Sequence, residues 1–182
     1  VAPARPRTVF TVHNAAFQGN FAPECTGRLG LPREALAPEA MEFWGRISFL
    51  KSGIRYADRV NTVSPTYAAE ICTPEGGHGL DGDLRLRGDS VVGILNGVDY
   101  AEWNPATDQY LPHRYDDTDL TGKLLNKQAL LDLLRKPAAP STPLVGMVTR
   151  LTRQKGIDLL VDTLPELLGG TRDLRFVALG SG

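Results

Sequence analysis

Short segments rich in β-branched residues alternate along this chain with segments whose apolar residues recur at helical spacing. This alternation limits the fold more than any other feature, because it predicts an α/β class with a parallel sheet and crossover helices. The expected strands are residues 8–12, 59–63, 91–95, 144–148 and 174–179. The expected helices are residues 43–57, 65–71, 120–134 and 157–164. Pro165 is expected to end or kink the last of these helices, and Trp44, on the apolar stripe of the first, is expected in the core.

A proline-rich stretch, Lys136–Pro143 (KPAAPSTP), divides the pattern. Its prolines disfavour both helix and central strand, so it predicts a linker between two domains, residues 1–140 and 141–182. The sequence starts without Met and stops directly after an expected strand, where a parallel α/β unit normally continues into a loop and helix. We therefore expect a chain truncated at both ends.

Composition excludes several classes of function. The 20 basic residues are scattered and matched by 21 acidic ones, which argues against a nucleic-acid partner. The apolar runs fall short of the roughly 18 residues that a membrane span needs. Cys25 and Cys72 lack metal-ligand spacing and do not form a disulfide framework, so we expect no metal site and a cytoplasmic location.

Two cations follow an expected strand and precede an expected helix. Arg150 and Lys155 lie on this loop, which belongs to the edge of an open sheet where ligands bind. Fixed cations beside a helix N-terminus suit a diphosphate, whose negative charge grows as it leaves. Charge runs are more often solvated loops, and Arg153 fits that description better than its two neighbours. The position favours anion binding by Arg150 and Lys155.

The other strand ends carry weaker signals. His13, followed by Asn14, can bond a sugar hydroxyl or act as an acid or base, but a lone histidine is as often structural. A turn explains Asn96 and Asp99 equally well. A lone Gly-x-Gly motif is weak support for ligand approach at Gly180 and Gly182. Aromatic residues that could stack on sugars are Phe17, Trp44, Tyr67, Trp103 and Tyr115.

Four segments in order carry a resemblance to a known family. They are Thr11–Gly19 (TVHNAAFQG), Tyr56–Val60 with Thr62–Tyr67 (YADRV, TVSPTY), Gly93–Asp99 with Trp103–Pro105 (GILNGVD, WNP), and Arg150–Gly156 (RLTRQKG). Together they are similar to bacterial glycogen synthase and plant starch synthase. The resemblance implies a GT-B architecture, in which two Rossmann-like domains face a cleft. Residues 1–140 would be the later part of the acceptor-side domain, and residues 141–182 the start of the nucleotide-sugar-binding domain.

The resemblance also implies a hexosyltransferase that moves glucose from ADP-glucose to the non-reducing end of an α-1,4-glucan such as glycogen. The anomeric configuration would be retained, without metal or cofactor. It implies that Arg150 and Lys155 hold the donor diphosphate. His13 would lie near the glucose 6-hydroxyl, with its carbonyl facing the anomeric carbon. Asn14 and Asn96 would line the glucose pocket, beside substrate-binding Asp99, Gly180 and Gly182.

Two family loops are absent, a Lys-x-Gly-Gly-Leu loop and a C-terminal loop that contains a glutamate. We therefore expect no transfer by this chain alone. Same-face attack is expected, since no side-chain nucleophile is evident, but a double displacement stays open. Two other functions stay open as well. One is a GT-B enzyme that uses a UDP-sugar, and the other is a non-catalytic segment that binds glucan or nucleotide.

Overall fold

The computed structural model describes residues 5–170 and 173–182 of the chain. It has two compact units, Val1–Gly97 and Val98–Gly182. The predicted boundary near residue 140 falls inside the second of these units. It lies between the helix Thr121–Leu133 and the strand Leu144–Val148. The division into domains at that position stays a prediction. No helix of the described residues is long and apolar enough to cross a membrane.

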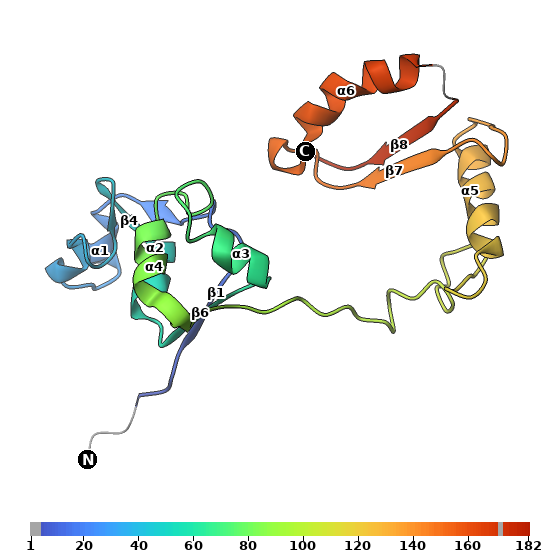
Figure 1. Cartoon of the computed structure of the whole chain (residues 1–182). Coiled ribbons are helices and arrows are strands. Elements are labelled where there is room, and N and C mark those ends of the chain that lie inside the picture. Colours follow the sequence, from blue (N-terminus) through green and yellow to red (C-terminus); the bar gives the residue numbers. More distant parts are fainter. Residues whose placement is uncertain (1–4, 171–172) are drawn as a thin grey trace. The chain divides into compact units, whose positions relative to one another are not determined.

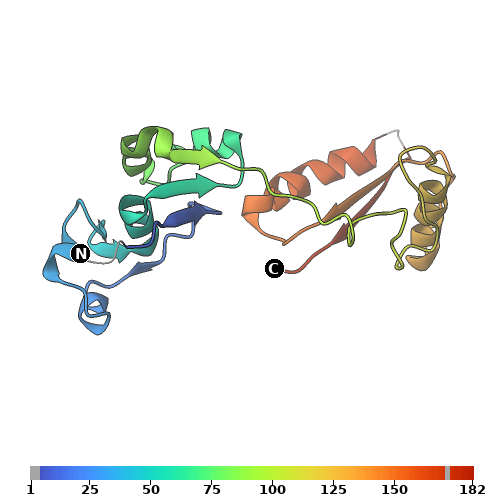
Figure 2. The same ribbon diagram turned by 90° about the horizontal axis from the view of Figure 1, so that it is seen from below.

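The first unit is built on a parallel sheet of three strands, seen side by side in Figure 2. Their order is β1 (Val9–Val12), β5 (Arg59–Thr62) and β6 (Val91–Gly93). The helices of this unit are α1 (Cys25–Arg28), α2 (Phe49–Tyr56), α3 (Pro65–Glu70) and α4 (Asp81–Arg87), with 3-10 turns η1 (Arg33–Leu36) and η2 (Gly88–Ser90). A small antiparallel sheet has the order β2 (Asn20–Phe21), β4 (Arg46–Ser48) and β3 (Glu42–Phe43). The predicted strands and the helix after Ser64 are confirmed, although β6 ends two residues earlier than expected and α4 was not predicted.

One apolar cluster connects the sheet to its helices. Its fully buried members come from strands β1 and β5, helices α2 and α4 and the loop after α3, and they include Val12, Ile54, Val60, Ile71, Leu80 and Leu84. Buried apolar side chains of this kind are the main stabilising contribution in a small α/β unit. The loops that follow the strands of this sheet are thus supported by a packed apolar core.

The helix expected over residues 43–57 is wrong in its first half. Trp44 and Gly45 both have positive φ angles, 52° and 75°, and form the turn of the β3–β4 hairpin. Helix α2 begins only at Phe49, where the Ser48 side chain caps it by accepting from the Lys51 N–H. The spacing of apolar residues predicted a helix here because the residues of a hairpin can match a helical pattern by chance. Trp44, expected in the core, is 83% exposed at the tip of this turn.

The second unit contains α5 (Thr121–Leu133), β7 (Leu144–Val148), η3 (Arg153–Lys155), α6 (Ile157–Gly169) and β8 (Arg175–Leu179). Strands β7 and β8 are parallel, and α6 is the crossover helix between them (Figure 1). The ammonium group of Lys127 on α5 donates to the carbonyl oxygen of Pro140 at 2.7 Å, so the predicted linker is tied to this helix. Helix α6 runs through Pro165 rather than ending before it. Pro165 has no N–H to donate to the Val161 carbonyl four residues earlier. Both residues are exposed, so water can bond that carbonyl instead.

Candidate active site

The loops that follow β1, β5 and β6 leave the sheet at one edge. The register aligns Val12 with Thr62 and Thr62 with Gly93, so the three strands end together. His13 directly follows the first of these positions, and Asn96 lies three residues beyond the last. The sequence-predicted residues His13, Asn14 and Asn96 are therefore brought to the carboxyl edge of one parallel sheet, which is the edge where open α/β folds bind ligands.

The His13–Asn14 loop is exposed at its tip. The His13 side chain is exposed, whereas Asn14 is half-buried. The Asn14 side-chain oxygen accepts from the Ala16 N–H at 3.0 Å, and its carbonyl accepts from the Phe17 N–H at 3.2 Å. Asn14 thus shapes the turn with its own oxygen and leaves its amide nitrogen as the group available for a ligand.

The last strand of this sheet passes very close to the start of α3. A Cβ atom on Gly93 would collide with the backbone of Ser64 and Pro65, so only glycine fits there. The chain then continues through exposed Asn96. Asp99 belongs to the second unit, where its carboxylate accepts from the Ala101 N–H at 2.9 Å. A turn begins at Asp99, but the turn expected at the Asn96-Gly97 dipeptide is not formed.

The basic loop of the second unit connects β7 to α6. Arg150 and Lys155 are both exposed, and no ion pair involves either of them within residues 5–170 and 173–182. Arg153 differs, because its guanidinium pairs with Asp158 in the first turn of α6 at 3.1 Å while remaining 92% exposed. All three basic side chains are exposed, so the expectation that Arg153 alone is a solvated residue stays a prediction. Arg150 and Lys155, which form no ion pair among the described residues, therefore precede the N-terminus of the 13-residue helix α6.

The glycines that end the chain pack against the same basic loop. A Cβ atom on Gly180 would collide with the Thr149 carbonyl oxygen, and one on Gly182 would lie 2.7 Å from the Leu151 carbonyl oxygen. The Leu151 N–H donates to the Ser181 carbonyl at 2.9 Å. Close backbone packing is thus sufficient to explain both glycines, and their predicted contact with substrate is untested by the structure.

The candidate sugar-stacking aromatics fall into two groups. Phe17 and Trp103 are 68% and 69% exposed, and Trp44 is more exposed still. Tyr67 instead packs against the main apolar cluster, and its hydroxyl accepts from the Ala15 N–H at 2.9 Å. A stacking role therefore does not suit Tyr67. This contact joins residues 52 apart in sequence, and no local pattern could have revealed it.

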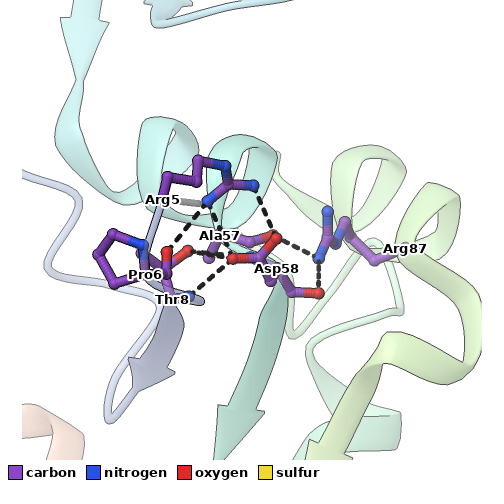
Figure 3. Close-up of polar contacts among 6 residues, drawn as sticks. All are labelled: Arg5, Pro6, Thr8, Ala57, Asp58 and Arg87. Carbon is purple, nitrogen blue, oxygen red and sulfur yellow. Dashed lines mark hydrogen bonds and ion pairs between the residues drawn. The ribbon is translucent and has the colours of Figure 1, made fainter. Parts of the chain in front are cut away.

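The opposite, amino-terminal edge of the sheet carries a dense polar cluster (Figure 3). The Asp58 carboxylate accepts from the Thr8 N–H at 2.7 Å and from the Arg5 guanidinium at 2.7 and 3.0 Å. These groups, with the Thr8 N–H contributing most, lower the pKa of Asp58 from 3.8 to about 2. Arg87 donates to the carbonyl oxygens of Ala57 and Asp58 at 2.7 and 3.1 Å. This cluster joins the amino-terminal ends of β1 and β5 to the carboxyl-terminal end of α4. Its position away from the carboxyl edge of the sheet indicates a structural role.

Comparisons with known proteins show which proteins this chain is similar to. A family profile described as the starch synthase catalytic domain matches residues 2–86. A glycogen synthase of Anaeromyxobacter sp. (strain Fw109-5) is 53% identical over 179 residues, which cover 98% of this chain and 37% of the relative. A glycogen synthase of Burkholderia thailandensis is 51% identical over 179 residues, covering 98% of this chain and 34% of the relative. The chain therefore spans about a third of the length of these relatives.

A solved structure is also similar. It is the catalytic domain of starch synthase IV from Arabidopsis thaliana bound to ADP and acarbose. It matches with a TM-score of 0.87 and 40% identity, over 96% of this chain and 36% of that one. The match confirms the predicted α/β class of the GT-B type.

Proposed function

Because the chain belongs to the family of bacterial glycogen synthases and plant starch synthases, we propose that the full-length protein is a retaining glucosyltransferase. It transfers glucose from ADP-glucose to the non-reducing end of an α-1,4-glucan such as glycogen. The starch synthase IV structure with ADP and acarbose supports a nucleotide site and a glucan site in this family. The reaction takes place in the cytoplasm, where Cys25 and Cys72 remain thiols.

The observation that carries the proposal is the pair of exposed cations between β7 and α6. In the proposed reaction, Arg150 and Lys155 hold the diphosphate and stabilise the charge that develops on it as the bond to glucose breaks. Asp158 would oppose an anion at this helix N-terminus, but its charge is balanced by Arg153 at 3.1 Å. The two cations balance the leaving group, and the proposal includes neither a metal ion nor an organic cofactor.

The transferring glucose is assigned to the carboxyl edge of the first unit. Asn14 and Asn96 bond its hydroxyl groups, and His13 lies beside the 6-hydroxyl with its carbonyl toward the anomeric carbon. Asp99, Gly180 and Gly182 contribute to donor binding. The incoming glucan hydroxyl attacks from the face that ADP leaves, because the loops that directly follow β1 and β5, residues 13–19 and 63–64, contain no carboxylate that could act as the nucleophile of a double displacement. Its proton passes to the departing diphosphate.

The test is glucan elongation by the full-length protein. Purified enzyme is incubated with glycogen and either ADP-glucose or UDP-glucose, and nucleotide release and chain length are followed together. We expect elongation with ADP-glucose and release of one ADP for each glucose added. A clear preference for UDP-glucose would show that the donor is UDP-glucose and not ADP-glucose. Nucleotide binding without transfer would show that the protein is a binding protein and not an enzyme.

A further inference from the structure

The backbone that carries His13 and Asn14 is held on both sides by hydroxyl groups from neighbouring elements. On one side, the Thr62 hydroxyl on β5 donates to the Val12 carbonyl at 2.7 Å. On the other, the Ala15 N–H donates to the Tyr67 hydroxyl on α3 at 2.9 Å. The two residues between these contacts, exposed His13 and half-buried Asn14, are thus fixed at both ends.

The Thr62 contact is buried, and the Tyr67 contact is partly buried, with its Ala15 N–H on a residue that is itself buried. Thr62 has no exposed surface, and Ala15 is 1% exposed. A buried backbone N–H left without a partner destabilises its local conformation. Removal of the Tyr67 hydroxyl would therefore force the Ala15 segment either to move or to admit water.

Tyr67 is itself rigidly placed. Its N–H donates to the Ser64 hydroxyl at 2.9 Å, in the N-terminal cap of α3, and its ring packs against the main apolar cluster. The far end of the same loop is held as well, since the Gln18 carbonyl accepts from the Ser48 hydroxyl at 3.0 Å and from the Leu50 N–H at 3.1 Å. The loop is therefore preorganised by contacts from four elements, β5, α3, β4 and α2, and Tyr67 supplies the contact from α3.

From these contacts we infer that Tyr67 is a positioning residue, which holds the His13–Asn14 backbone in place through the Ala15 N–H. The inference rests on the proposed function, in which this backbone faces the reacting carbon of glucose. Small displacements of such a group lower the rate of the chemical step more than they weaken binding of the donor. Tyr67 holds this backbone in position and does not itself touch the substrate.

The experiment compares Tyr67→Phe with Tyr56→Phe in the full-length enzyme. Tyr56 is the matched control because the same hydroxyl is removed from a side chain that is 61% exposed. We expect Tyr67→Phe to lower kcat about tenfold or more, with KM for ADP-glucose changed by no more than about twofold. We also expect hydrogen exchange of the Ala15 amide to become about tenfold faster or more. Thr62→Val, which frees the Val12 carbonyl, should give the same kinetic pattern.

Each outcome has a definite meaning. A kcat for Tyr67→Phe equal to that of Tyr56→Phe would overturn the inference, as would a decrease that only matches the loss of folded enzyme. An unchanged exchange rate at Ala15 would also overturn it. If the wild-type enzyme transfers no glucose, the proposed function fails, and faster exchange at Ala15 in Tyr67→Phe would still support the contact itself.

Discussion

Two leucines on helix α4 allow the packing of the first unit to be tested with an internal control. Leu84 is fully buried in the main apolar cluster, whereas Leu86, two residues later, is 75% exposed. Leu84→Ala removes three buried carbon atoms and leaves a cavity, which is expected to lower the free energy of unfolding by about 3 kcal/mol. For a unit of this size, the loss lowers Tm by roughly 10–20 °C. Leu86→Ala is expected to change the free energy of unfolding by no more than about 0.5 kcal/mol.

The assay is thermal and urea unfolding of the 182-residue chain, followed by circular dichroism. Urea unfolding gives the free energy directly, and an unchanged m-value would show that the variant unfolds between the same two states. Equal losses in the two variants would refute the reasoning, because they would mean that α4 does not bury Leu84 in preference to Leu86.

Three further predictions concern a cap, an acid and the isolated chain. Ser64→Ala removes the N-cap of α3 and should lower the free energy of unfolding by about 1 kcal/mol in urea titrations, whereas no loss would mean that the cap is dispensable. Because the pKa of Asp58 is lowered in the folded state, its contribution to stability is complete above pH 3.8 and disappears as the pH falls to about 2. The stability difference between wild type and Asp58→Asn should shrink over that window, and a constant difference would contradict the assignment. The 182-residue chain alone should release no ADP from ADP-glucose with glycogen, and robust release would show that the absent loops are unnecessary.

Local signals in the sequence predicted most of the regular structure. The β-branched runs placed β1, β5 and β7, and Ser64 followed by Pro65 marked the start of α3. These features succeed because capping and alternation depend on neighbouring residues only. The placement of His13 and Asn96 at one edge of one sheet followed from the parallel connections in the same way.

Features that depend on distant contacts or unusual backbone angles could not be predicted. Phe43 and Ile47 are both buried, which imitates a helical stripe, while the positive φ angle of Trp44 turns the chain into a hairpin. The exposed state of Trp44 follows from that turn. The bond from Ala15 to Tyr67 depends on how α3 packs over the sheet, and the sequence offers no periodic trace of it.

The central claim is that the loop between β7 and α6 holds the departing diphosphate. The most direct test compares Lys155→Ala with Arg153→Ala in the full-length enzyme, because the two cations share a loop and only Arg153 is paired with Asp158. The measurement is ADP release from ADP-glucose with glycogen at saturating substrate. We expect Lys155→Ala to lower kcat by about a hundredfold or more, and Arg153→Ala to lower it by no more than about threefold. Near-normal ADP release by Lys155→Ala would contradict the central claim.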